Sequence, residues 1–132
     1  MATPQNRLFG NVPQNDPLEF YSSHGLQYKR IAEFLDFDNN ALSKIAGVSK
    51  NTVRLDNKIP KDLRERLEQI ANIITLVAEH FDADANKTAL WFKTTNPSLG
   101  EISPRDMIRL GRYEKLLKFV IEASQANPDS DR

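Results

Sequence analysis

The side chains in this sequence with the clearest chemical potential are basic ones gathered between residues 43 and 61. This stretch contains five lysine and arginine residues and only one acid, Asp56, whereas the whole chain balances 18 basic residues against 18 acidic ones. Ammonium and guanidinium groups at this density are suited to binding phosphates. Because the chain carries no net charge, no general field would steer it toward nucleic acid. Phosphate binding therefore depends on how this segment folds, and a solvated helical surface is the alternative.

Residues 41–54 have the pattern of a helix-turn-helix motif. Ser43 supplies the small residue that the first helix needs where the second crosses it, and Gly47 tolerates the positive φ of the tight turn. Ser49 is placed to cap the second helix, whose N-terminal end then faces a DNA major groove. The apolar residues expected to lock the two helices together are Leu42, Ile45, Val48 and Val53. A plain helical hairpin is the alternative, because its turn favours the same residues.

The outward side of this motif carries the residues that we expect to contact DNA. With Val53 pointing inward, Asn51 is placed to read an adenine edge, and Arg54 a guanine or a phosphate. The expected DNA-binding residues are Lys44, Ser49, Lys50, Asn51, Thr52, Arg54 and Lys58. Because one copy has few cations, binding of double-stranded operator DNA is expected to need a homodimer, which would neutralise ~6–8 phosphates.

The second helix of the motif departs from the usual pattern at Asp56, where an apolar residue is typical. Leu55 falls on the outward side instead. Two explanations are open. Either the helix is short and Leu55 packs with Ile59 beyond it, or Leu55 meets a thymine methyl group.

The elements that position these residues are predicted to be helices almost throughout, because apolar residues recur at helical spacing. Residues 26–36 have this spacing, and a second helix begins near Asn39 or Asn40 and ends before Gly47. Pro60 then stands at the first position of a helix of about six turns. The apolar stripe of this helix consists of Leu63, Leu67, Ile70, Ile74, Val77 and Phe81. The stripe suits packing against another helix, either within the chain or in a second copy.

The C-terminal half is predicted to contain three shorter helices. Asp82 or Asp84 caps the first of them. Ser103 and Pro104 give the second helix a cap and a first-turn proline, and Gly111 ends it. The last helix carries an apolar face that consists of Tyr113, Leu116, Leu117, Val120 and Ile121.

Enzyme and metal chemistry find little support in the composition. The chain has no cysteine and only two histidines, His24 and His80, so thiolate metal sites, disulfides and histidine clusters are not expected. The sequence has no Gly-rich phosphate loop and no nucleophile with a matching base. We therefore expect no enzyme activity and no cofactor. Without a long apolar run or a secretory-signal pattern, we expect a cytoplasmic protein with no membrane contact.

Residues 90–114 resemble the toxin-binding domain of the Xre/MbcA/ParS antitoxin family. The matching features are a helix end led by Trp91, the turn Asn96-Pro97-Ser98-Leu99-Gly100, the helix start Ser103-Pro104, and Gly111 before the last helix. The long helix after Pro60 is also similar to the family. The resemblance extends over about residues 26–124 and does not include the first 25 residues.

The resemblance implies a type II antitoxin, in which one part binds DNA and another binds and silences a toxin. The usual partner in the family is a RES-domain toxin that depletes NAD, and the antitoxin often dimerises and represses its own operon together with the toxin. The implied fold class is all-α, with a helix-turn-helix N-terminal part joined by a long helix to a small helical toxin-binding domain. The expected organisation is a flexible N-terminal segment (1–25), a helix-turn-helix-like DNA-binding region (26–59), a long connecting helix (60–81), the toxin-binding domain (82–124) and a C-terminal tail (125–132).

The family motif residues are expected to build the small domain rather than to contact the toxin. They are Trp91, Asn96, Pro97, Gly100, Pro104, Gly111 and Tyr113. The expected toxin contacts are exposed cations on the last two helices, namely Arg105, Arg109, Arg112 and Lys115. Because the toxin's substrate carries phosphates, its pocket should accept cations, and we expect a basic or tail segment of this chain to occlude it. Two alternatives stay open: a stand-alone helix-turn-helix transcription regulator, and a toxin inhibitor whose DNA-binding half has decayed.

Overall fold

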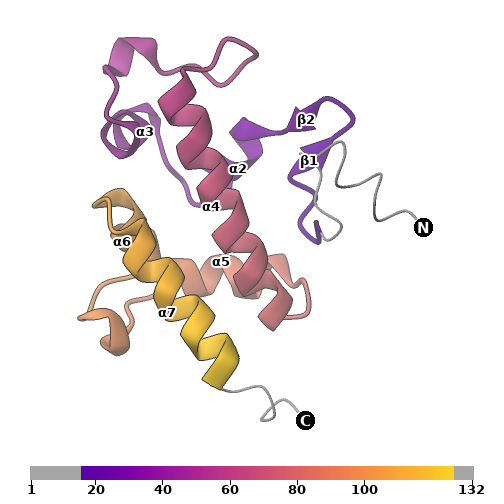
Figure 1. Ribbon diagram of the computed structural model, residues 1–132, viewed down its shortest axis with the longest axis vertical. Helices are drawn as coiled ribbons and strands as arrows, with labels where there is room; N and C mark the ends of the chain where they lie inside the picture. Colours follow the sequence, from indigo (N-terminus) through magenta and orange to yellow (C-terminus); the bar gives the residue numbers. More distant parts are fainter. Residues whose placement is uncertain (1–15, 127–132) are drawn as a thin grey trace.

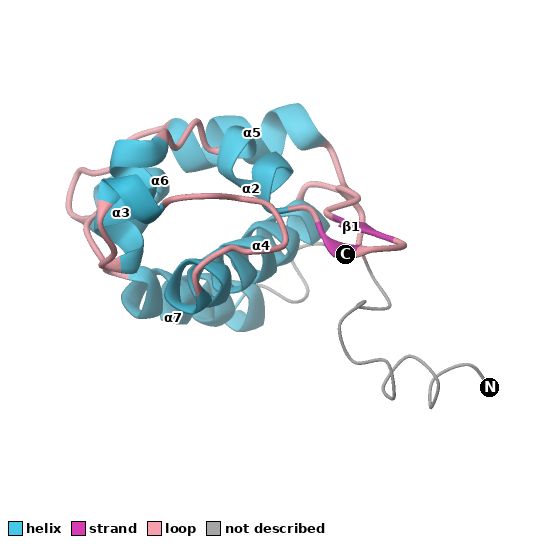
Figure 2. Ribbon diagram, turned by 90° about the horizontal axis from the view of Figure 1, so that it is seen from above, coloured by secondary structure: helices cyan, strands magenta, loops and turns pink. Residues whose placement is uncertain are grey.

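The computed structural model describes residues 16–126, and these residues are mostly helical. The elements are β1 (Tyr21–Ser22), β2 (Gly25–Leu26), α2 (Tyr28–Phe34), α3 (Asn39–Ala46), the 3₁₀ helix η1 (Lys50–Thr52), α4 (Lys61–His80), α5 (Ala85–Lys93), the 3₁₀ helix η2 (Pro97–Leu99), α6 (Pro104–Arg109) and α7 (Tyr113–Ala126). The prediction of a helical fold is confirmed. Within the described residues, the short antiparallel hairpin of β1 and β2 is the addition to it (Figures 1 and 2).

Helix α4 is the central element of the fold, since α2, α3, α5 and α7 all pack against it (Figure 1). Pro60 occupies its N-cap position, one residue before the helical position that we expected. The buried face of α4 consists of Leu63, Leu67, Ile70, Ala71, Ile73, Ile74, Val77 and Ala78. This face is wider than the predicted stripe, as is typical of a helix covered on more than one side. Because the stripe is buried within a single chain, a homodimer would need another surface.

The structure differs from the sequence-based expectation in residues 16–25, which we expected to be flexible. Leu18 and Phe20 are buried, with 7% and 1% of their surfaces exposed. The ring of Phe20 meets that of Phe34 edge to face, with 5.7 Å between their centroids. The Asp16 carboxylate accepts a hydrogen bond from the Phe20 backbone N–H at 3.0 Å and so closes the turn between them. Burial of two large apolar side chains outweighs the polar, proline-containing composition that suggested fraying.

The boundaries of the first helix and of the termini follow from this packing. The helix expected from residue 26 begins at Tyr28, because Gly25 and Leu26 pair with β1. The rest of the expected N-terminal segment, residues 1–15, lies outside the described residues, and so do residues 127–132 of the expected tail.

Helix α3 begins and ends where the sequence predicts. The Asp38 carboxylate accepts a hydrogen bond from the Ala41 backbone N–H at 2.8 Å and caps its first turn. Gly47 adopts φ 71°, in the left-handed region, and its N–H donates to the Ser43 carbonyl at 2.9 Å. The Ser43 hydroxyl in turn donates to the Val48 carbonyl at 2.6 Å. Ser43 therefore fixes the turn after α3 directly.

The Asn-Pro-Ser-Leu-Gly segment, residues 96–100, forms η2 and its two caps. The Asn96 side chain accepts a hydrogen bond from the Ser98 backbone N–H at 2.9 Å, so it acts as a side-chain cap. Gly100 adopts φ 86°. Pro97 is exposed at the start of η2, so it restricts the backbone there rather than filling the core. The backbone N–H of Asn96 donates to the Ile102 carbonyl at 3.0 Å, which closes the loop.

The turn between α6 and α7 is a Schellman motif centred on Gly111. This glycine adopts φ 81°, and its N–H donates to the Ile108 carbonyl at 3.0 Å. The Arg112 N–H donates to the Met107 carbonyl at 2.8 Å, which completes the motif. Burial raises the pKa of Tyr113 at the start of α7, and the neighbouring Asn72 side chain of α4 partly offsets this rise. The Gly111 turn sets the direction in which α7 leaves α6.

We predict that the cap of α6 has a measurable share in stability. The buried Ser103 hydroxyl oxygen accepts a hydrogen bond from the Asp106 backbone N–H at 3.1 Å. Ser103→Ala is expected to lower the free energy of unfolding by about 1 kcal/mol, measured by urea denaturation. Ser98→Ala, at an exposed position in the preceding turn, is the control. Equal effects of the two substitutions would contradict the capping role.

Candidate functional site

The residues expected to bind DNA all lie on the exposed surface, from the end of α3 through η1 to the loop before α4. The second helix of the expected motif is shorter than predicted, however. It is the single 3₁₀ turn η1, and the Ser49 side chain makes no capping hydrogen bond to it. This segment therefore lacks the length of a typical recognition helix.

The inward packing of Leu55 explains why this helix ends early. Val53 has extended backbone angles, φ −70° and ψ 117°. Val53 and Leu55 are both half-buried against the core, in which Ile59 is 8% exposed. Alternate residues of an extended chain point to the same side, whereas a helix would turn Leu55 outward. The structure favours the explanation in which Leu55 packs inward over contact with a thymine methyl group.

Arg54 is held by Asp56 in a bidentate ion pair on this surface. Its Nε and Nη2 donate to the two carboxylate oxygens at 2.8 and 2.6 Å. The Lys58 backbone N–H donates to the same carboxylate at 3.0 Å. These hydrogen bonds, that from Arg54 foremost, lower the pKa of Asp56 to about 2. A DNA phosphate must therefore compete with Asp56 for the Arg54 guanidinium.

We predict that Arg54→Ala raises the pKa of Asp56 from about 2 toward its ordinary value of 3.8. Carboxyl carbon shifts followed by NMR during an acid titration measure it. Because the folded-state pKa is depressed, any stability from this pair is present above the ordinary pKa and is lost as the pH falls toward 2. Lys58→Ala is the matched control, since its backbone donor remains. An unchanged Asp56 pKa in Arg54→Ala would refute the pairing.

Arg105, which we expected to be a free toxin contact, is instead engaged within the fold. Its Nε donates to the Leu35 carbonyl, and its Nη2 donates to the Asp36 carbonyl at 2.8 Å. The guanidinium lies 4.9 Å from the centroid of the Phe37 ring. Lys93 binds the Asp36 carboxylate at 2.7 Å and lowers its pKa. The carbonyls at the end of α2 need donors, and Arg105 of α6 supplies them.

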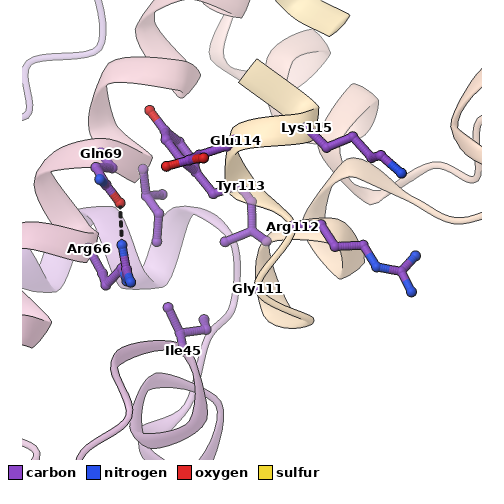
Figure 3. A pocket seen from close by; sticks show the side chains of 10 residues that line it. Ile45, Arg66, Gln69, Gly111, Arg112, Tyr113, Glu114 and Lys115 are labelled. Carbon is purple, nitrogen blue, oxygen red and sulfur yellow. Dashed lines mark hydrogen bonds between the residues drawn. The ribbon is translucent and has the colours of Figure 1, made fainter. Parts of the chain in front are cut away.

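The other three predicted toxin contacts are exposed. The Arg109 Nε donates to the Asp106 carboxylate at 3.1 Å. Arg112 and Lys115 have no ion pair within the part of the chain that the structure describes. Figure 3 shows their side chains extending to the same side from the start of α7. Together with Arg109 at the end of α6, we call these exposed cations the α6–α7 cationic surface.

Beside this surface lies a cleft of about 360 Å³, at the junction of α3, α4 and the turn between α6 and α7 (Figure 3). Sequence reasoning missed its wall on α4, which includes Arg66 and Gln69. Both residues lie outside the apolar stripe from which the sequence predicted the packing of α4. Only the packing of α3 and α7 against α4 shows that this side lines a cleft.

The described residues contain no group of three or more histidine, cysteine, aspartate and glutamate side chains that could hold a metal ion. His24 is exposed beside Ser23, and His80 stacks edge to face with Phe81 at 5.4 Å. Across residues 16–126, no helix has the length and apolar character to cross a membrane.

Comparison with known proteins gives no match for this chain among family models, curated proteins or solved structures.

Proposed function

We propose that this chain is the antitoxin of a type II toxin–antitoxin system, which binds and neutralises a RES-type NAD-depleting toxin. The observation that carries the proposal is the α6–α7 cationic surface, held in place by the Gly111 turn. Arg112 and Lys115, the two cations of this surface without an ion pair among residues 16–126, are able to bind carboxylates of a partner. The resemblance of residues 90–114 to the toxin-binding domain of the Xre/MbcA/ParS family supports the same surface.

The neutralisation that we propose is steric and electrostatic. A pocket that accepts a dinucleotide presents donors for phosphate and acceptors for ribose, and a protruding cation can pair with any carboxylate among them. Arg109 ends α6, Arg112 lies in the turn after it and Lys115 lies in the first turn of α7, so we propose that the three contact the partner together. The chain needs no catalytic group of its own for this role.

We also propose that the chain represses its own operon as a homodimer, through a helix-turn-helix N-terminal part that ends in η1. What supports this is the set of exposed residues along α3, η1 and the following loop, among them Lys44, Lys50 and Lys58. Because η1 is one turn, phosphate contacts are expected to outnumber contacts to bases. The alternatives are a stand-alone helix-turn-helix regulator and a toxin inhibitor whose DNA-binding half has decayed.

Co-purification tests the toxin proposal. The tagged full chain is co-expressed with the reading frame that adjoins its gene, and a RES-type toxin is expected to be retained with it. Retention of no neighbouring product, or a gene with no toxin-like neighbour, would favour the stand-alone regulator.

A salt titration with promoter fragments tests the DNA proposal. Lys50→Ala and Arg54→Ala are expected to weaken binding and to reduce its dependence on salt. Lys87→Ala, on the exposed start of α5, is expected to change neither. Binding of the toxin without any binding of the promoter would favour the decayed inhibitor.

A further inference from the structure

The cleft described above has an apolar lining from three helices. Ile45 comes from α3, Ile70 from α4 and Ile108 from α6. Ile70 and Ile108 are buried, and Ile45 is half-buried. Its volume of about 360 Å³ lies at the lower end of the range of ligand pockets, roughly 300–1,000 Å³. The cleft therefore suits one or two apolar side chains rather than a large cofactor.

One wall of the cleft carries a guanidinium group without a carboxylate partner. The Arg66 Nη1 donates to the Gln69 side-chain oxygen at 3.1 Å, a contact drawn in Figure 3. No carboxylate among residues 16–126 lies within ion-pair distance of Arg66. Its remaining donors are open to an incoming acceptor.

The charge around the cleft is one-sided. Arg66, Arg112 and Lys115 are among its lining residues, whereas Glu114 is the acid among them. In Figure 3 the side chains of Arg112 and Lys115 extend away from the cleft, where a ligand that continues beyond it would meet them. The cations of α6, by contrast, have an acidic partner, because Arg105 and Arg109 lie 3.8 and 3.1 Å from the Asp106 carboxylate. Basic side chains thus outnumber acidic ones among the residues that line the cleft.

We infer that this cleft binds an acidic segment of a partner protein, which inserts an apolar side chain among Ile45, Ile70 and Ile108 and presents a carboxylate to Arg66. Neighbouring acids of the same segment pair with Arg112 and Lys115. The apolar lining favours a peptide over nucleic acid, because a phosphate backbone has no apolar group to bury there. The inference rests on the proposed function in one respect, which is that the partner is a protein.

The test uses the full chain with ¹³C-labelled isoleucine methyl groups. The probe is the peptide acetyl-Asp-Glu-Leu-Phe-Glu-Asp-amide, added up to millimolar concentration. The methyl signals of Ile45, Ile70 and Ile108 are expected to shift, while that of Ile121 on the exposed side of α7 stays unchanged. Arg66→Glu is expected to weaken binding at least about tenfold. Arg66→Gln should weaken it less, and Lys87→Glu, on exposed α5, should leave it unchanged.

Three outcomes would overturn the inference. They are the absence of any shift at millimolar peptide, equal binding of a peptide with asparagine and glutamine in place of its acids, and shifts of the same methyl groups by short duplex DNA at physiological salt. The last would assign the cleft to nucleic acid. The peptide experiment contains no toxin. If the peptide does not bind, the proposed function is therefore unaffected, and if the chain does not bind a toxin, the peptide result is unaffected.

Discussion

Reversing both charges in Arg112→Glu with Lys115→Glu is expected to weaken the complex with a RES-type toxin at least about a hundredfold. Neither cation has an ion pair within residues 16–126, so neither reversal costs an interaction of the free chain that the structure shows. Each reversal replaces an attraction across the interface by a repulsion. Calorimetric titration of the toxin with the full chain measures the loss.

Two controls distinguish a loss of interface contacts from a general effect of charge or of unfolding. Lys87→Glu carries an equal change of charge on exposed α5 and is expected to leave the affinity unchanged. Thermal unfolding of the double variant is expected to match that of the natural chain, because both side chains are exposed. Unchanged affinity in the double variant would remove the α6–α7 cationic surface from the toxin interface.

Arg105→Met is expected to lower the free energy of unfolding by about 2 kcal/mol. The substitution keeps most of the apolar length of the side chain but leaves the Leu35 and Asp36 carbonyls without their charged donor. It also removes the contact with the Phe37 ring. Urea denaturation followed by circular dichroism measures the change.

The matched control for this prediction is Arg109→Met, four residues further along the chain at the end of α6. Arg109 is exposed, and within residues 16–126 its one ion pair is with the Asp106 carboxylate, so its loss is expected to cost less than about 0.5 kcal/mol. If Arg105→Met left stability unchanged and abolished toxin binding, Arg105 would be the partner contact that the sequence suggested.

Local signals predicted the helices of this chain well. Helix α3 begins at Asn39 and ends before Gly47, as predicted, and α6 lies between its predicted cap Ser103 and its predicted end at Gly111. Capping preferences depend on a few neighbouring backbone groups, which the sequence specifies directly. The long stripe of α4 was likewise visible, because its period is that of a helix.

Contacts between distant segments could not be predicted in the same way. The Arg105 contact with Leu35 joins residues 70 positions apart, and nothing in either local pattern indicates it. The segment before α2, with its hairpin, is ordered because Leu18 and Phe20 pack into a core that the helices form. Arg66 belongs to the cleft only because α3 and α7 pack on either side of α4.

The segment after Gly47 shows how tertiary packing outweighs a local motif. Its turn chemistry matches a helix-turn-helix, yet Val53 and Leu55 both turn toward the core, and the helix ends after one 3₁₀ turn. Asp56, which departs from the motif, follows this turn and forms an ion pair with Arg54. The departure at this position was visible in the sequence, whereas its structural consequence was not.

The central claim is that this chain silences an NAD-depleting enzyme by binding it. The most direct measurement is the rate of NAD loss catalysed by a purified RES-type toxin that co-purifies with this chain, with increasing amounts of the full chain. We predict that NAD loss stops once the two proteins form a stoichiometric complex, and that Arg112→Glu with Lys115→Glu shifts this inhibition to much higher concentration. Undiminished NAD loss in the presence of excess natural chain would contradict the account.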